Sequence, residues 1–341
     1  MTETVKLFSP YSLRGVTLSN RIVISPMCQY SAHEGYLDTW HKIHLGRFVM
    51  GGAGLIFTEA TAVQKSGRIT HGCPGLWEDG QVGAHAEITS FARTHGAVSA
   101  IQLAHAGRKG GMQRPWYGNS FLTEADHGRG DHPWIPSGPS PVPVNDGWPV
   151  PHEMTLRDIE ELRDDFVAAT KRAVRAGYDV LEVHGAHGYL IHSFLSPLSN
   201  HRSDAYGGSL QNRMRLALEI SEAVRAVWPD DLPLFFRVSA VDGSADGWKI
   251  EDTVHLAKAL KAVGVDVIDC SSGGISGSAT AGNSGRRQPG FQVPFASQVK
   301  EGADMATMAV GLITHAKQAE MILKDKQADL IAIGQIGRAH V

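Results

Sequence analysis

Short runs of apolar and β-branched residues recur along the chain, and most precede a loop and then a stretch with helical periodicity. Strand, loop and helix alternating in this order indicate parallel strands joined by crossover helices. The runs that predict strands are residues 21–26, 54–63, 97–107, 178–185, 232–240, 265–273, 305–311 and 328–334. Eight strands at this spacing favour a closed (β/α)8 TIM barrel, forming one domain over residues 1–341. An open doubly wound sheet that binds a dinucleotide would need a G-x-G-x-x-G sequence after a strand, and none stands there.

The clearest helical pattern lies between residues 155 and 177, where Gly177 ends it. Its apolar positions are Ile159, Leu162, Phe166, Ala169 and Ala173. A second pattern covers residues 209–227, with Ser209 as its predicted N-cap. Both segments are predicted crossover helices between barrel strands.

Three segments fall outside this repeat. Residues 1–20 predict a short hairpin that closes the floor of the barrel. Residues 108–152 form a long loop after the third strand, rich in Gly, Pro and Trp, and its aromatic residues favour a lid over a disordered segment. After the eighth strand only residues 335–341 follow, so the eighth helix and a C-terminal tail are expected to be missing. Either a partner chain covers that flank or the chain is altered there.

Composition excludes several classes of protein. The chain has 32 Lys+Arg against 35 Asp+Glu, a formal net charge of -3, and no basic block, so nucleic acid is not an expected partner. Its three cysteines, Cys28, Cys73 and Cys270, have no C-x-x-C spacing, which argues against a disulfide framework, a zinc knuckle or an iron–sulfur cluster. No window approaches the ~18 apolar residues of a membrane span, and the N-terminus lacks a signal-peptide core. We expect a cytoplasmic protein that does not contact membranes.

Polar residues gather where the predicted strands end, which is where barrels of this class place their active sites. His184 and His187 stand three residues apart at the end of the fourth strand, and Tyr189 follows. Helical zinc sites use histidines at i and i+4 with a glutamate between, so this spacing argues against a metal. The histidines could simply be satisfied at a buried strand end. Against that, Val180, Glu182 and His184 alternate onto one face, and Gly185 is expected to let His187 turn to the same mouth.

The wider set of strand-end residues favours a cofactor. Donors and cations are abundant and carboxylates are scarce. Gly311 and Gly334 follow the seventh and eighth strands, where barrels often hold phosphate on backbone N–H groups. Taken alone, these two glycines are better explained by turn formation.

Several long motifs of the chain resemble those of the Old Yellow Enzyme family of flavin-dependent ene-reductases, in particular its thermophilic-like and xenobiotic-reductase branch. They include "RIVISPMCQYS", "WHKIHLGR", "IQLAHAGRKG", "EVHGAHGYLIHSFLSPLSNHRSDAYGGSLQNR" and "DVIDCSSGG", and the likeness covers nearly the whole chain. It implies a (β/α)8 barrel with non-covalent FMN, reduced by NADPH or NADH and reoxidised by an activated alkene. It also implies a homodimer or homotetramer.

The resemblance assigns cofactor-binding residues. Ser25, Pro26, Met27 and Cys28 would line the flavin edge, with Ala60 and Gln102 on its pyrimidine side. Arg237 would lie near N1 and O2, where a permanent cation suits the anionic reduced ring. Gly311, Gly334, Gln335 and Arg338 would surround the phosphate. The family usually has Gly-Arg after the eighth strand, whereas this chain has Gly334-Gln335 and an arginine three residues later at Arg338. Either Arg338 substitutes or phosphate binding is weakened.

The resemblance also assigns the reaction. His184 and His187 would donate hydrogen bonds to the carbonyl oxygen of an α,β-unsaturated substrate, while hydride passes from flavin N5 to the β-carbon. Tyr189 would supply the proton to the α-carbon. Cys28 marks this branch and would tune the flavin and touch the substrate, whose pocket Tyr30 and Lys109 would line. Two alternatives remain at this point: a flavin-deficient barrel that binds phenolic or carbonyl ligands without turnover, and a metal-dependent barrel hydrolase.

Overall fold

Eight parallel strands close into a barrel in the computed structural model, which describes residues 5–276 and 287–334. Around the barrel the order is β10, β11, β12, β3, β4, β5, β8 and β9. The strands are β3 (Ile22–Ile24), β4 (Leu55–Ala62), β5 (Val98–Ala104), β8 (Val180–Gly185), β9 (Leu234–Ser239), β10 (Val267–Ser271), β11 (Ala306–Ala309) and β12 (Leu330–Ile333). Each lies inside its predicted run, which confirms the barrel.

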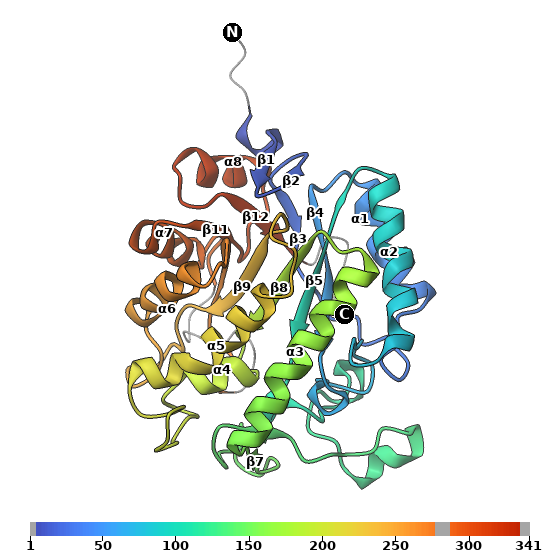
Figure 1. The fold of residues 1–341 in the computed structure, drawn as a ribbon, viewed down its shortest axis with the longest axis vertical. Helices are drawn as coiled ribbons and strands as arrows, with labels where there is room; N and C mark the ends of the chain where they lie inside the picture. The colour runs from blue at the N-terminus through green and yellow to red at the C-terminus, as the bar shows by residue number, and fades with distance from the viewer. Residues whose placement is uncertain (1–4, 277–286, 335–341) are drawn as a thin grey trace.

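A helix follows each of the first seven barrel strands (Figure 1). The helices are α1 (Thr39–Met50), α2 (Val82–Thr94), α3 (Leu156–Ala176), α4 (Leu190–Leu195) with α5 (Leu210–Arg225), α6 (Ile250–Ala262), α7 (Val293–Ala303) and α8 (Ala316–Lys324). Gly177 ends α3 with φ 80° and Ser209 caps α5, as predicted, and the side chain of Thr155 caps the start of α3. All five apolar positions predicted for α3 are buried. The predicted absence of an eighth helix concerns residues outside the described part.

The predicted N-terminal hairpin is confirmed as β1 (Tyr11–Leu13) and β2 (Val16–Leu18). Leu18 packs into the cluster of inward-facing apolar side chains that fills the barrel, with Val23, Phe57, Val180 and Phe235 among its members. Figure 1 shows the hairpin at the upper end of the molecule, with the connection from β5 to α3 at the lower end. The hairpin therefore plugs the N-terminal end of the barrel and leaves the C-terminal end for a site.

The long connection between β5 and α3 contains only short elements. They are 3-10 turns at Gly107–Lys109, Pro115–Tyr117 and Glu124–Arg129 and the strands β6 (Ser137–Gly138) and β7 (His152–Glu153), which pair with each other. Further 3-10 turns lie at Lys6–Phe8, Lys65–Gly67 and Asp79–Gln81. Within the part of the chain that the structure describes, no helix is long and apolar enough to cross a membrane.

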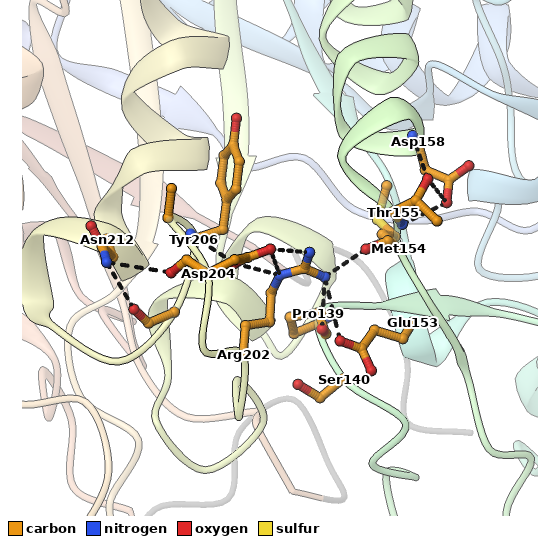
Figure 2. A network of polar contacts seen from close by, with 12 residues as sticks. Pro139, Ser140, Glu153, Met154, Thr155, Asp158, Arg202, Asp204, Tyr206 and Asn212 are labelled. Carbon is orange, nitrogen blue, oxygen red and sulfur yellow. Dashed lines mark hydrogen bonds and ion pairs between the residues drawn. The ribbon is translucent and has the colours of Figure 1, made fainter.

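One buried arginine ties the end of this connection to the segment between α4 and α5 (Figure 2). Arg202 donates to the carbonyl oxygens of Pro139 at 3.1 Å and Met154 at 2.5 Å. The same guanidinium forms a fork with Asp204, with Nη2–Oδ2 at 2.6 Å. Pro139 directly follows β6 and Met154 directly follows β7, so Arg202 holds the ends of both paired strands at once.

We expect Arg202→Met to lower the free energy of unfolding by about 2–3 kcal/mol, because two carbonyls and Asp204 lose charge-assisted hydrogen bonds. Urea unfolding followed by circular dichroism measures the change. Arg157→Met is the matched control, since Arg157 makes only an exposed i,i+4 contact with Glu161. Equal urea midpoints for both variants would contradict the role of Arg202.

Candidate active site

Parallel pairing at the C-terminal end of the barrel brings four buried polar side chains together. Gln102 on β5 pairs in register with Glu182 on β8, and its Nε2 donates to Glu182 Oε1 at 2.8 Å. Arg237 on β9 pairs in register with Asp269 on β10, with Nε–Oδ2 at 3.1 Å. Burial raises the pKa of Glu182, and the nearby Asp269 carboxylate adds to this while Arg237 opposes it. The floor of the mouth is thus a hydrogen-bonding layer with one fixed cation.

The turn after β8 presents the predicted catalytic side chains. His187 and Gly188 adopt left-handed conformations, with φ 62° and 73°. A Cβ at Gly188 would clash with the carbonyl of Gly274, so only glycine fits there. The prediction that Gly185 provides the turn is wrong: Gly185 has no left-handed φ, and its lack of a Cβ instead leaves room for the Phe236 ring.

Three contacts hold this turn in place. The His187 amide donates to Ser239 Oγ at 2.9 Å. Lys109 donates to the carbonyl of His187 at 2.8 Å and also to that of Gly274. Burial and the neighbouring Arg108 cation lower the pKa of Lys109 to about 7. The ammonium group of Lys109 therefore supports the turn through backbone carbonyls, and a contact of Lys109 with substrate stays a prediction.

The rings of His184, His187 and Tyr189 form one cluster. Their centroids lie 5.2 Å apart for His184–His187, 5.2 Å for His184–Tyr189 and 6.4 Å for His187–Tyr189. His184 is buried, whereas His187 and Tyr189 are partly exposed. Burial lowers the pKa of both histidines, and the Arg237 cation lowers it further. Both imidazoles are therefore neutral at pH 7 and can act as hydrogen-bond donors without carrying charge.

The network around His187 indicates which ring nitrogen carries its proton. Gln292 Nε2 donates to Ser271 Oγ at 3.1 Å, and Ser271 Oγ lies 2.7 Å from His187 Nε2. If the Ser271 hydroxyl donates to Nε2, every group in this chain is satisfied and the proton of His187 resides on Nδ1. His187 then has an N–H left to offer a ligand.

Tyr189 belongs to an apolar cluster with both cysteines of this region. Ile69, Cys73 and Ala106 form its buried part, and Cys28, Tyr30 and Tyr189 pack against it. Burial raises the pKa of Tyr189, and the proximity of Cys28 and Cys73 raises it further. Burial likewise raises the pKa of Cys28. Tyr189 is therefore a neutral phenol that retains its proton at pH 7.

Tyr30 forms the outer wall of this cluster. It has a left-handed φ of 54°, and its ring meets the Trp116 ring edge-on at a centroid distance of 6.2 Å. Trp116 comes from the long connection after β5 and is more than half exposed. The structure thus brings the long connection to the mouth of the barrel, as a lid requires, although closure itself is untested.

Residues 25–28 follow β3 and lie beside β4. The pairing of β4 with β5 shifts between Thr58 and Ala60, so Glu59 occupies a bulge. At the bulge, the Glu59 carboxylate accepts from the amide of Gln29 at 2.8 Å. Ala60, one position further, stays in register with Gln102. The bulge therefore both anchors the segment after Cys28 and leaves small Ala60 next to Gln102.

The predicted phosphate end is only partly described. Gly311 follows β11 with φ 113°, and a Cβ there would meet the Gln292 side chain at 2.6 Å. Gly334 follows β12, and a Cβ there would lie 3.6 Å from the Met27 sulfur. Gln335 and Arg338 lie outside the described residues. The two glycines are thus at the same mouth as the other candidate residues, and the choice between Gln335 and Arg338 stays open.

The residues present fit a flavin. Among the described residues, Ser25 Oγ, Glu182 Oε2 and His184 Nδ1 are buried without a hydrogen-bond partner, and all belong to the C-terminal ends of barrel strands. Buried polar atoms are normally paired, so such a concentration indicates a polar ligand. An isoalloxazine ring offers the carbonyl oxygens and ring nitrogens that these groups could bind. In the described ranges no group of three or more His, Cys, Asp or Glu residues could hold a metal ion.

Comparison with known proteins agrees with this fit. The chain matches the NADH:flavin oxidoreductase / NADH oxidase family over residues 6–338. It is 46% identical over 331 residues to an NADPH dehydrogenase of Geobacillus sp. (strain WCH70), which covers 96% of this chain and 89% of that protein. The structure of an old yellow enzyme homologue from Zymomonas mobilis matches with TM-score 0.78 and 25% identity, over 96% of this chain and 88% of the other. A 2-naphthoyl-CoA reductase matches with TM-score 0.83 and 24% identity over 96% of this chain, which spans about half (50%) of that longer protein.

Fold, donor set and matches together define a flavin-dependent oxidoreductase built on a TIM barrel. The chain belongs to the Old Yellow Enzyme family of NADH:flavin oxidoreductases. It is accordingly an NAD(P)H-dependent enzyme with FMN as its cofactor.

Several residues of the site were not singled out from the sequence. They are Ser239, Gln292, His192 and Asp242. Ser239 ends β9 and could have been found from its position at a strand end. His192 lies on α4 and Asp242 lies beyond β9. No motif in either segment indicates that these two side chains meet.

Acid sensitivity is expected from buried neutral histidines such as His105, which follows β5. Burial lowers the pKa of His105 to about 4, against ~6.5 for an unfolded histidine. As pH falls, the unfolded chain takes up the proton first, so this contribution to stability is full above pH ~6.5 and lost towards pH ~4. His105→Gln should reduce the pH dependence of the unfolding free energy by about 1.4 kcal/mol per pH unit in this window. Urea unfolding between pH ~4 and ~6.5 measures the unfolding free energy as a function of pH. His255→Gln, on the exposed face of α6, is the control. Equal slopes of unfolding free energy against pH for the two variants would contradict the expectation.

Proposed function

We propose that this chain is an FMN-dependent NAD(P)H ene-reductase that reduces the C=C bond of α,β-unsaturated carbonyl compounds. The observation that carries the proposal is the cluster of His184, His187 and Tyr189 rings at the mouth of the barrel. It combines two neutral hydrogen-bond donors with one neutral phenol, next to a fixed guanidinium. When bound, FMN takes a hydride equivalent from NAD(P)H and returns it to the β-carbon of the alkene.

The two histidines bind and polarise the carbonyl oxygen of the substrate. Negative charge collects on that oxygen as the β-carbon is reduced, and donors fixed in advance stabilise it by about 2.7–4 kcal/mol each. Both imidazoles are suited to this because their lowered pKa keeps them neutral, so neither repels a neighbouring cation. Ser239 accepts from the backbone amide of His187 and fixes the turn, and the contact between Ser271 Oγ and His187 Nε2 holds the ring in one orientation before substrate arrives.

Tyr189 is suited to deliver the proton to the α-carbon. Its ring centroid is 5.2 Å from that of His184, so a substrate oxygen on the histidines would place the adjacent carbons near the phenol. The raised pKa of Tyr189 keeps it protonated until a strongly basic enolate carbon forms. Ser25, Pro26, Met27, Cys28, Ala60, Gln102 and Arg237 would hold the flavin ring, and Gly311 and Gly334 the phosphate end.

The absorption spectrum of the purified protein tests the proposal. We expect a yellow protein, or one that turns yellow when FMN is supplied, which bleaches anaerobically with NADPH and regains colour with 2-cyclohexenone. A protein that takes up FMN and is bleached by NADPH, but is not reoxidised by 2-cyclohexenone or other activated alkenes, would contradict the substrate class. A protein that stays flavin-free after FMN is supplied would instead support a barrel that only binds carbonyl or phenolic ligands.

A further inference from the structure

A fully buried histidine and carboxylate lie directly behind the turn that presents His187 and Tyr189. His192, on α4, and Asp242, three residues beyond β9, have no solvent-exposed side-chain surface, and His192 Nε2 lies 2.9 Å from Asp242 Oδ1. Neither atom has another hydrogen-bond partner among residues 5–276 and 287–334.

The other ring nitrogen of His192 reaches the turn itself. The backbone N–H of Gly188 donates to His192 Nδ1 at 2.8 Å. Nδ1 must therefore be unprotonated, and the single proton of the neutral ring resides on Nε2, facing Asp242. Gly188 stands between His187 and Tyr189 and has the left-handed φ of 73°, so this hydrogen bond fixes the residue at which the turn reverses.

Asp242 is held as a carboxylate that faces the imidazole. Its Oδ2 accepts from Ser196 Oγ at 2.6 Å and from the Trp248 amide at 2.7 Å, which leaves Oδ1 for His192. Burial by itself raises the pKa of Asp242, but the contacts with His192, Ser196 and the Trp248 amide together hold it below its usual value. The carboxylate is thus ionised and its orientation is set by donors on two elements.

We propose that Asp242 and His192 are positioning residues for the reaction: Asp242 selects the His192 tautomer that accepts from Gly188, and this acceptor holds the turn that aims His187 and Tyr189. The inference rests on the function proposed above for those two side chains. Neither residue touches the substrate, and the catalytic groups remain His184, His187 and Tyr189. A carboxylate that fixes the tautomer of a histidine is a known device in other enzymes, where the histidine itself moves the proton. Here the histidine instead positions a backbone turn.

Asp242→Asn tests the tautomer. The side-chain oxygen of the new asparagine would still accept from Ser196 and from the Trp248 amide. The NH2 group of the same side chain would therefore face His192 Nε2. Two donors would then face each other, so His192 would move its proton to Nδ1 and oppose the Gly188 N–H. We expect the reduced enzyme to react with 2-cyclohexenone about ten-fold more slowly or worse, while reduction by NADPH is nearly unchanged. A purely structural role would not separate these two half-reactions.

Ser196→Ala is the matched control, because it removes one hydrogen bond from the same carboxylate but leaves the His192 contact. It should leave both half-reactions nearly unchanged. An Asp242→Asn protein that is folded and reacts with 2-cyclohexenone as fast as the wild type would overturn the proposal.

Two substitutions of His192 decide the question if Asp242→Asn does not fold. In His192→Asn, the side-chain Oδ1 takes the place of the imidazole Nδ1 and can still accept from the Gly188 N–H. In His192→Gln, the side-chain Nε2 takes the place of the imidazole Nε2 and reaches only Asp242. We expect His192→Asn to lose stability but keep the reaction with 2-cyclohexenone, and His192→Gln to lose about ten-fold in that reaction. Equal rates for the two variants would contradict the role of the acceptor.

Amide hydrogen exchange keeps this inference separate from the proposed function. The Gly188 amide should exchange slowly in the wild type and in His192→Asn, and fast in His192→Gln. If the wild type fails to reduce any activated alkene but this pattern is observed, the proposed function is wrong and the positioning of the turn stands. If exchange at Gly188 is the same in all three proteins, the inference is wrong whatever the enzyme reduces.

Discussion

Tyr189→Phe should slow the reaction of the reduced enzyme with 2-cyclohexenone by about 10²–10⁴-fold, the usual contribution of a positioned proton donor. The substitution removes one oxygen and keeps the ring that packs against the buried cluster of Ile69, Cys73 and Ala106. Reduction by NADPH needs no proton from this phenol and should be nearly unchanged. Stopped-flow absorbance of the flavin, followed separately in each half-reaction, measures both rates.

Tyr178→Phe is the matched control for this prediction. Tyr178 is a second buried tyrosine whose hydroxyl lies 2.9 Å from Thr58 Oγ1 and 2.7 Å from His85 Nδ1, outside the cluster of catalytic rings. Loss of its hydroxyl should cost stability and leave both half-reactions intact. If Tyr189→Phe is no slower than Tyr178→Phe, the proton comes from another group and the role given to Tyr189 is wrong.

His187→Ala should lower the rate of the same oxidative step by about 10²–10³-fold, because it removes one of two donors to the developing oxyanion. The effect on substrate affinity should be smaller than the effect on rate, since the charge on the oxygen is greatest in the transition state. Steady-state kcat and KM for 2-cyclohexenone, together with stopped-flow rates, separate the two.

His187→Asn is the informative comparison. Asparagine tolerates the left-handed φ of 62° at this position and carries an amide N–H that can replace the imidazole donor. We expect it to keep most of the rate that His187→Ala loses. If the two variants are equally slow, the loss reflects the disturbed turn or the broken Ser271 contact, and His187 is not the donor.

The fold was largely predictable from local pattern. Each barrel strand lies inside a run of apolar residues, and α3 keeps the spacing that starts at Ile159 and stops at Gly177. These features follow from a strand period of two and a helical period of 3.6, which are properties of neighbouring residues. The bulge at Glu59 could not be predicted in this way, because it depends on the register with β5.

The candidate site was predictable in its membership but not in its arrangement. His184, His187 and Tyr189 lie within six positions of one another, and the likeness to a family gave them expected roles. The role expected of Gly185 was wrong because the sequence shows two glycines in this turn, and only the structure shows that Gly188 takes the left-handed conformation. The sequence also could not show that the ammonium group of Lys109 binds two carbonyls that are 78 and 165 positions away along the chain.

By itself the sequence determined the barrel, the strand ends that carry chemistry, and the identity of the side chains that stand there. The tertiary structure decided which nitrogen of His192 carries a proton, that the pKa of both catalytic histidines is lowered, and that the pKa of Tyr189 is raised. Those properties depend on burial and on partners from elsewhere in the chain: Arg237 on β9, Ser271 at the end of β10 and Asp242 in the loop after β9. They arise only when the barrel closes, because protonation responds to the three-dimensional surroundings of a group and not to its neighbours in the chain.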